Sequence, residues 1–265
     1  MSYLTNKVIW ITGASSGIGE ALVYELSRKK TKLILSARRK KELERVKGNC
    51  PPAVQADIRI LPLDLEKSDT LKLCVQAALQ LFGGIDILIN NGGIRLGSRI
   101  SDTPLEADRK VMEINYFGAI ALAKYLLPHF VSKQRGHFVN ISSVTGIFGT
   151  PYRSAYAASK HALHGFFDSL RAEHHHDHVT VTMICPGFIQ TSLPLSSVTA
   201  SASASKPQAA KSPRMPVRRA ARKIVAAISK RKQEVYIGGK EVFGVYLKRF
   251  FPSIFSAIIR KVEVR

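Results

Sequence analysis

The sequence predicts an α/β fold, a doubly wound parallel sheet with helices on both faces. Short apolar runs of β-forming residues alternate along the chain with longer segments whose apolar residues recur at helical spacing. The short runs are continuously apolar, which is typical of parallel strands buried on both faces. Because crossovers between parallel strands are right-handed, we expect the sheet to be wound in two directions from its centre.

The first predicted strand, residues 8–11, leads directly into a glycine-rich turn. Gly13, Gly17 and Gly19 follow it, and apolar residues then recur at helical spacing as far as Leu26. Glycine allows the backbone to approach an anion, and a helix N-terminus presents N–H groups and the positive end of its dipole. The spacing G-x-x-x-G-x-G is related to the dinucleotide fingerprint G-x-G-x-x-G. It predicts a phosphate-binding turn, with an ordinary strand-to-helix turn as the alternative.

The alternation continues through the rest of the chain. Further strands are predicted at 32–39, 58–64, 85–90, 136–142, 179–185 and 234–237, and further helices at 40–47, 68–82, 105–131, 152–173 and 217–232.

We expect a single domain over 1–265, because 265 residues with 45% hydrophobic content suffice for one large core. Residues 188–233 are predicted to form a substrate lid. Their low-complexity part, 196–212, follows the carboxyl end of a strand, where open α/β sheets bind ligands; an interdomain linker is the alternative. Residues 239–265 form a C-terminal extension rich in aromatic and basic residues. Such a segment lies on a membrane surface or packs against the body or a partner subunit.

Charge and cysteine content restrict the cellular setting. The 40 Lys and Arg residues against 19 Asp and Glu give a formal charge of +21, which attracts polyanions. No nucleic-acid motif accompanies this charge, so we expect a solvated basic surface and no specific nucleic-acid partner. The chain shows no signal peptide or membrane-length apolar run, and its three cysteines are widely spaced. We therefore expect a cytoplasmic protein, with membrane association through the C-terminal extension left open.

Tyr156 and Lys160 are predicted to lie one turn apart on the same face of a helix. A phenol with a pKa of about 10 is a poor acid or base at neutral pH, and a nearby ammonium group lowers that pKa. Tyrosine then becomes usable for proton transfer. Taken alone the pair is weak, because most such pairs are surface neighbours, but Ser143 ends the strand before this helix and Asn115 lies in the helical segment before that strand.

In combination these motifs resemble the short-chain dehydrogenase/reductase family, over roughly residues 5 to 192. The residues that carry the resemblance are Asn90-Asn91-Gly92-Gly93, Asn115, Ser142-Ser143, Tyr156-Ala-Ala-Ser-Lys160 and Pro186-Gly187. The sequence at 36–47, 86–93 and 158–163 is most similar to the family branch of dehydrogenase/reductase members 7 and 7B. The resemblance implies a Rossmann-type fold and a homodimer or homotetramer formed through the two long helices.

The resemblance also implies catalytic roles. Tyr156 would be the general acid/base, and Lys160 would lower its pKa and bind the nicotinamide ribose. Ser143 would hydrogen-bond the substrate carbonyl oxygen, and Asn115 would support a water-linked proton relay behind Lys160.

The implied cofactor-binding residues extend along the whole chain. Besides Tyr156 and Lys160 they are Gly13, Ser15, Ser16, Gly17, Ile18 and Gly19 at the pyrophosphate, Arg38 and Arg39 at the end of the second strand, Asp64 and Leu65 at the adenine, Asn91 and Gly92 at the adenosine ribose, and Pro186, Gly187, Ile189 and Thr191 at the nicotinamide carboxamide. The family usually has alanine at position 92, and we expect the missing methyl group to loosen the site slightly.

The end of the second strand predicts the cofactor. Arg38 and Arg39 stand where NAD enzymes place an acidic residue, and no acid precedes Glu42. Guanidinium groups bind phosphate through a fork of donors, so we expect NADP(H). Two solvated arginines at a helix start are the alternative. The run 174–178 contains four histidines, but adjacent helical histidines point in different directions, so no metal site is expected.

The sequence therefore predicts an NADP(H)-dependent oxidoreductase that interconverts a hydrophobic ketone or aldehyde and its alcohol. The segment after Ser143 is largely apolar, at Val144, Ile147, Phe148 and Tyr152, which suggests a small apolar substrate. One alternative is a 3-oxoacyl-thioester reductase whose basic surface receives an acidic carrier protein. Another, from a different class, is a non-catalytic nucleotide- or polyanion-binding protein on the same fold.

Overall fold

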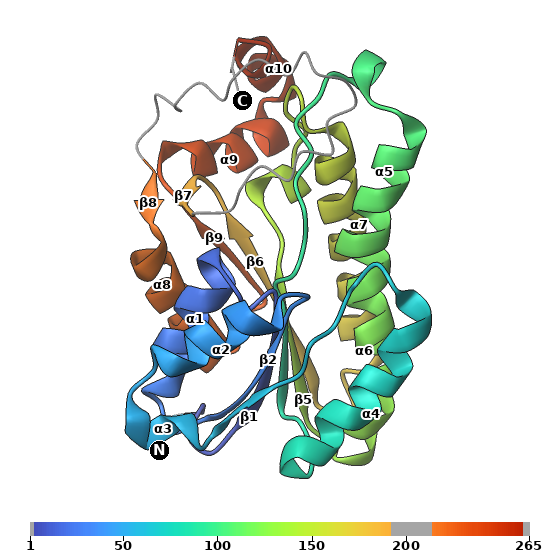
Figure 1. Ribbon diagram of the computed structural model, residues 1–265. Coiled ribbons are helices and arrows are strands. Elements are labelled where there is room, and N and C mark those ends of the chain that lie inside the picture. The colour runs from blue at the N-terminus through green and yellow to red at the C-terminus, as the bar shows by residue number, and fades with distance from the viewer. Residues whose placement is uncertain (1–2, 192–213, 262–265) are drawn as a thin grey trace.

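A seven-stranded parallel sheet forms the centre of the molecule, which confirms the predicted fold class (Figure 1). The computed structural model describes residues 3–191 and 214–261 of the chain. The strand order is β3-β2-β1-β4-β5-β6-β9, so the sheet grows outward in both directions from the β1–β4 pair. In such sheets ligands bind at the carboxyl ends of the strands, where the winding direction switches. The strands are β1 (Val8–Thr12), β2 (Lys32–Ser36), β3 (Ile58–Ile60), β4 (Ile87–Asn90), β5 (Gly136–Ile141), β6 (Val179–Pro186) and β9 (Glu234–Ile237).

Helices cover both faces of the sheet, and the side chains of β1 alternate between the two layers. Ile9 and Ile11 are fully buried against one layer, and Trp10 is fully buried against the other. The first layer holds α1 (Gly17–Ser27), α2 (Lys40–Gly48) and α8 (Val217–Ser229). The second holds α4 (Leu71–Phe82), α6 (Gly118–Ser132) and α7 (Ser154–Glu173), with α5 (Leu105–Met112) against α7; the short α3 (Pro52–Gln55) precedes β3.

The long helix expected at 105–131 is interrupted. Between α5 and α6 the chain makes one π-helical turn, Glu113–Phe117, which contains the buried Asn115. A π turn holds one extra residue compared with an α turn and often marks a functional position. The sequence pattern does not reveal it, because the apolar spacing continues on both sides of the turn.

The predicted lid region, 188–233, is described only in part. Residues 192–213 lie outside the described residues. On either side of them, β7 (Ile189–Gln190) pairs with β8 (Met215–Pro216), and α8 follows directly. The inner face of α8, with Ala221, Ile224 and Ile228 buried, belongs to the same core as α1. The apolar face of α8 is thus part of the core, and its basic residues lie on the solvent side. The substrate lid stays a prediction.

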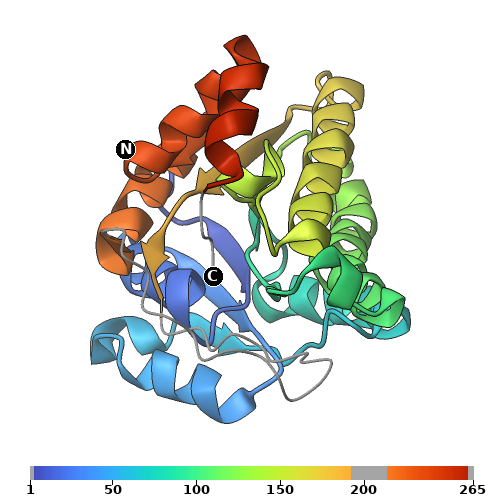
Figure 2. The same ribbon diagram turned by 90° about the horizontal axis from the view of Figure 1, so that it is seen from above.

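The C-terminal extension forms two short helices, α9 (Phe243–Phe250) and α10 (Pro252–Ile259), above the carboxyl ends of the strands (Figures 1 and 2). Val245 and Phe255 are buried against Val144 and Phe148, and the rings of Phe148 and Phe255 are 5.0 Å apart. The extension thus covers the end of the sheet where ligands are expected. Within the described ranges, no helix combines the length and apolarity needed to cross a bilayer.

Candidate functional site

A cavity of about 940 Å³ lies at the carboxyl ends of the strands, beneath α9 and α10. It is large enough for a dinucleotide or a sizeable organic ligand. Most of the predicted site residues line it, namely Gly13, Ser15, Ser16, Ile18, Arg38, Arg39, Asp64, Leu65, Asn91, Gly92, Ser143, Tyr156, Lys160, Pro186, Gly187, Ile189 and Thr191. Gly17, Gly19 and Asn115 are not among its lining residues. Gly19 packs against the glycine turn, and Asn115 forms hydrogen bonds with the chain after β4.

The glycine turn between β1 and α1 is too tightly packed for side chains. Gly13 and Gly17 have φ values of 63° and 58°, in the left-handed region that glycine favours. A Cβ atom on Gly13 would lie 2.7 Å from the Cα of Gly92. Ser16 caps α1 without a side-chain hydrogen bond, so no side chain competes for the first N–H groups of the helix. The turn and the helix start have the features of a phosphate-binding site.

Thr12 and Asn91 hold this turn against the end of β4. The Thr12 hydroxyl oxygen accepts hydrogen bonds from the backbone N–H groups of Asn91 and Gly92, both at 3.0 Å. The Asn91 side-chain amide donates to the carbonyls of Thr12 (2.9 Å) and Gly13 (3.1 Å). The amide of Asn91 therefore supports the turn, while the residue still lines the cavity. Sequence reasoning missed Thr12, whose only signal is a polar residue ending an apolar strand.

Gly92 does not loosen the site as expected. A Cβ atom at this position would lie 2.6 Å from Cδ1 of Leu65 and 3.3 Å from Oγ1 of Thr12. Leu65 is buried and occupies the space that a methyl group on residue 92 would need. The missing methyl is therefore compensated by a neighbouring side chain.

Asn115 fixes the chain that leaves β4. Its Oδ1 accepts from the backbone N–H of Ile94 (2.7 Å), and its Nδ2 donates to the Ile94 carbonyl (2.9 Å) and to Ser159 Oγ (3.1 Å). Ile94 lines the cavity, and Ser159 precedes Lys160 on α7. These bonds join the loop after β4 to α7. The water-linked relay stays a prediction.

Lys160 is buried on α7 and faces the end of β5. Its Nζ donates to the Ile141 carbonyl at 2.8 Å and lies 5.7 Å from the centre of the Tyr156 ring. Burial lowers the pKa of Lys160 to about 8, because a cation is poorly solvated there. The ammonium group therefore titrates much closer to neutrality than an exposed lysine.

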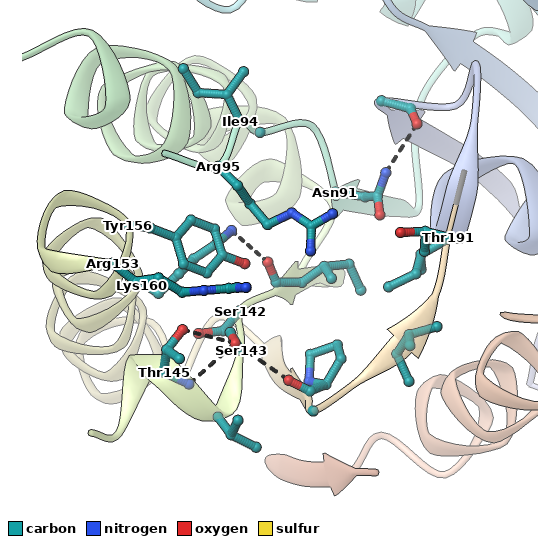
Figure 3. A pocket seen from close by; sticks show the side chains of 18 of the residues that line it. Asn91, Ile94, Arg95, Ser142, Ser143, Thr145, Arg153, Tyr156, Lys160 and Thr191 are labelled. Atoms are coloured by element: carbon teal, nitrogen blue, oxygen red, sulfur yellow. Dashed lines mark hydrogen bonds between the residues drawn. The ribbon is translucent and has the colours of Figure 1, made fainter. Parts of the chain in front are cut away.

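Tyr156 projects from α7 into the cavity beside Ser143 and two arginines (Figure 3). Burial raises the pKa of its phenol, whereas the positive charges of Arg95 and Arg153 and a hydrogen bond with Ser143 lower it. The sequence prediction gave the lowering role to Lys160. Among the described residues, the charges that lower this pKa come instead from Arg95 and Arg153, which sequence reasoning missed.

Ser143 is oriented by its neighbours at the end of β5. Its backbone is extended, and its hydroxyl oxygen accepts from the N–H (3.1 Å) and the hydroxyl (2.9 Å) of Thr145. Its own proton is donated to the Pro186 carbonyl over 3.4 Å, near the limit for a hydrogen bond. The proton is therefore available to a better acceptor in the cavity.

The far wall of the cavity is largely apolar. Val144 and Phe148 line it as predicted, whereas Ile147 packs in the adjacent cluster with α9 and α10, and Tyr152 is not a lining residue of the described cavity. The extension contributes further apolar lining at Phe243, Leu247, Phe255, Ile258 and Ile259. The histidine run lies after the end of α7, where His174 Nδ1 and Asp177 Oδ2 are 2.7 Å apart.

Comparison with known proteins gives the family. A family model described as short chain dehydrogenase matches residues 7–200. The chain belongs to the short-chain dehydrogenase/reductase family, a family of oxidoreductases.

Several relatives of the dehydrogenase/reductase member 7 and 7B type cover most of the chain. A member 7-like protein of Anopheles gambiae is 41% identical over 98% of this chain and 84% of its own length. Mouse member 7B is 38% identical over 97% of the chain and 81% of its own length. Human member 7 is 46% identical over 72% of the chain, but the match spans only 57% of the human protein.

Solved structures share the fold. A short-chain dehydrogenase from Streptomyces avermitilis superposes with a TM-score of 0.81, with 26% identity over 97% of this chain and 96% of its own. A short-chain dehydrogenase from Burkholderia cenocepacia in complex with NADP gives a TM-score of 0.81 at 24% identity, covering 99% of this chain and 100% of its own. One from Burkholderia phymatum in complex with NAD gives 0.82 at 23% identity, covering 94% of this chain and 95% of its own.

Proposed function

We propose that this protein is an NADP(H)-dependent oxidoreductase that interconverts a hydrophobic ketone or aldehyde and its alcohol. One observation carries the proposal. Tyr156, Ser143 and Lys160 meet at one end of a cavity whose other end holds the glycine turn and Arg38. This arrangement suits a dinucleotide that extends from the turn to the phenol.

The residues divide the work at the substrate oxygen. A bound nicotinamide cofactor would supply the hydride to the carbonyl carbon, or accept it from the alcohol. The Ser143 hydroxyl donates a hydrogen bond to the same carbonyl oxygen and holds it beside the phenol. Tyr156 donates its proton to that oxygen during reduction and takes it back during oxidation. Lys160 places a positive charge behind the phenol and is a donor for the cofactor's ribose hydroxyls.

A substrate screen tests this function. Ketones and aldehydes are offered with NADPH, and alcohols with NADP⁺, while the absorbance of the reduced nicotinamide is followed. We expect turnover of apolar carbonyl compounds. A purified protein that binds NADPH and turns over none of them would support the non-catalytic alternative.

The cofactor preference is proposed from Arg38 and Arg39, which line the cavity after β2. The Burkholderia cenocepacia neighbour was solved with NADP and the Burkholderia phymatum neighbour with NAD, so the fold accepts both. Guanidinium groups at this point favour the 2′-phosphate of NADP(H).

Arg38→Asp is expected to reverse this preference. The ratio of kcat/KM for NADPH to that for NADH should fall about 100-fold, because an acid there repels a phosphate and accepts a ribose hydroxyl. The measurement is steady-state kinetics with both cofactors. Arg28→Asp makes the same charge change on the exposed end of α1 and should leave the ratio unchanged. An unchanged ratio in the Arg38 variant would contradict the proposed NADP(H) preference.

A second activity follows from the formal charge of +21. A basic surface suits an acidic carrier protein, so 3-oxoacyl-thioester reduction is the alternative carbonyl chemistry. Kinetics with free and carrier-bound 3-oxoacyl substrates separate the two. A large preference for the carrier-bound form, lost at high salt, would favour the alternative.

We also propose that the surface of α9 and α10 lies on an anionic membrane. Its exposed side chains include Phe243, Phe250 and Phe251, and Lys248 and Arg249 flank them. Aromatic side chains bordered by cations are typical of helices that rest in the bilayer interface. Because Phe243 also lines the cavity, an apolar substrate could enter from the lipid.

Phe250→Asp combined with Phe251→Asp is expected to weaken vesicle binding at least about 10-fold, because two aromatic anchors are replaced by anions. Co-sedimentation with phosphatidylserine-containing vesicles is the measurement. Leu73→Asp on α4, at a side chain 68% exposed, is the matched control. Binding that survives both aromatic replacements would contradict the proposal.

The assembly and the cytoplasmic location remain proposals. Leu105 on α5, Phe117 in the π turn and Tyr125 on α6 are exposed, and this surface suits contact with a second subunit. We propose a homodimer or homotetramer formed through this surface and α7. Light scattering of the purified protein gives the subunit number.

A further inference from the structure

Three arginines line the cavity at its substrate end, and the proposed reaction assigns none of them a contact with the substrate. Arg95 lies in the loop after β4, Arg153 directly precedes α7, and Arg214 directly precedes β8. Figure 3 shows the Arg95 and Arg153 side chains approaching Tyr156 from two different elements. The three residues come from distant parts of the sequence, so no linear motif indicates the cluster.

Their charges act on one another and on the phenol. Arg95 and Arg153 both lower the pKa of Tyr156. Burial lowers the pKa of the Arg153 guanidinium, and the positive charges of Arg95 and Arg214 lower it further. Like charges held together in a partly buried site cost free energy, and a bound anion offsets that cost.

The described residues that line the cavity include two acidic side chains. They are Asp64 and Glu241. The Glu241 carboxylate accepts hydrogen bonds from the backbone N–H groups of Phe188 (2.8 Å) and Gly239 (3.0 Å). Asp64 accepts from the Glu66 N–H at 3.2 Å and lies at the predicted adenine end. Among the described lining residues, basic side chains therefore outnumber acidic ones at this end of the cavity.

We propose that Arg95 and Arg153 bind an anionic group of the substrate, with Arg214 at the edge of the same subsite. This proposal rests on the proposed carbonyl–alcohol chemistry and restricts the class of substrate. The substrate class is a carbonyl compound that carries a carboxylate or a phosphate, with its apolar remainder against α9 and α10. Guanidinium groups suit both anions, because their donor forks match two oxygens at once.

Arg153 lies close to the proposed proton donor in the sequence. It is the residue directly before α7, three positions before Tyr156, and both side chains line the cavity. A substrate held by both residues therefore carries its anionic group near its carbonyl group.

The test compares matched substrates on the full chain. A ketone bearing a carboxylate is compared with its neutral methyl ester, and a ketone bearing a phosphate is the second anion. For Arg153→Gln and for Arg95→Gln, the ratio of kcat/KM for the acid to that for the ester should fall about 10- to 100-fold, mainly through KM. Arg153→Lys keeps the charge and should retain part of the preference. Arg99→Gln, in the same loop but outside the cavity lining, should leave the ratio unchanged.

Three outcomes would overturn the proposal. Equal losses for acid and ester, together with a shifted pH profile, would mean that the arginines only tune Tyr156. A parallel loss of NADPH affinity, measured by nucleotide fluorescence, would mean that they bind the cofactor's phosphates. If the wild-type enzyme prefers the ester to both anionic ketones, the anion subsite is contradicted, and the proposed oxidoreductase function is unaffected.

Failure of the proposed oxidoreductase function would give a different result, namely no turnover of any substrate. If neither acid nor ester is turned over, calorimetric titration with the carboxylate-bearing ketone still tests the subsite. Binding to the wild type that is lost in Arg153→Gln supports the anion subsite, and equal or absent binding overturns it. Thermal unfolding of each variant checks that the fold is intact.

Discussion

Tyr156→Phe is expected to lower kcat/KM about 10²- to 10⁴-fold, the range over which positioned acids and bases contribute to proton transfer. The substitution removes the hydroxyl that hydrogen-bonds Ser143 and keeps the ring beside Lys160. Affinity for NADPH should change little, because the proposed cofactor contacts with the glycine turn and Lys160 remain. Steady-state kinetics and nucleotide fluorescence measure the two effects separately.

The pH dependence of the wild type gives a second readout of the same group. Carbonyl reduction needs the protonated phenol, so its rate should fall as pH rises through the pKa of Tyr156. Alcohol oxidation needs the phenolate, so its rate should rise over the same range. Burial raises this pKa, which places the change on the alkaline side. Both pH dependences, the fall in the reduction rate and the rise in the oxidation rate, should be absent in Tyr156→Phe.

Tyr125→Phe is the matched control, because this tyrosine is exposed on α6 and does not line the described cavity. Its kinetics should match those of the wild type. Full activity in Tyr156→Phe would contradict the enzyme proposal and favour a protein that binds nucleotides without catalysis.

The fold was predictable because its signals are local. A buried parallel strand such as β1 needs an unbroken apolar run, and the turn after it needs glycine for its positive φ values. Each requirement acts on neighbouring residues and therefore appears in the sequence. The winding of the sheet in two directions was expected from the right-handed crossovers.

Features that depend on tertiary contacts were not predictable. The π turn contains Asn115, whose amide pairs with the backbone of Ile94 from another loop. The space beside Gly92 is filled by Leu65, far away in sequence. In both cases the partner is set by the folded chain, so single-sequence spacing cannot identify it.

Tyr156 and Lys160 also combine a feature set by local sequence with one set by tertiary contacts. The spacing of Tyr156 and Lys160 on α7 was predictable from helical geometry. Their pKa shifts were not, because burial depends on how α9, α10 and the loop after β4 close the cavity. Arg95 reaches the cavity from the loop after β4, so its effect on the phenol depends on the folded chain.

Gly19→Ala is expected to weaken NADPH binding about 100-fold, a loss typical of displacing a binding group by about 1 Å. A Cβ atom on residue 19 would lie 2.2 Å from the Gly13 carbonyl oxygen and 2.6 Å from Nδ2 of Asn91. The carbonyl belongs to the backbone and cannot rotate away, so the start of α1 must move from the turn. The free energy of unfolding should fall by about 1–3 kcal/mol, as for overpacked cores.

Gly165→Ala separates this steric effect from a general effect of alanine. Gly165 lies within α7, and a Cβ atom on it would meet no neighbouring atom within 4 Å, so the substitution should stabilise the helix by about 0.5–1 kcal/mol. Denaturant unfolding and nucleotide fluorescence measure both variants. The turn is the phosphate site only if Gly19→Ala loses far more affinity than stability alone explains, while Gly165→Ala keeps the wild-type affinity. Equal NADPH affinity in the two variants would place the pyrophosphate elsewhere, because a site formed by the first N–H groups of α1 cannot tolerate that displacement.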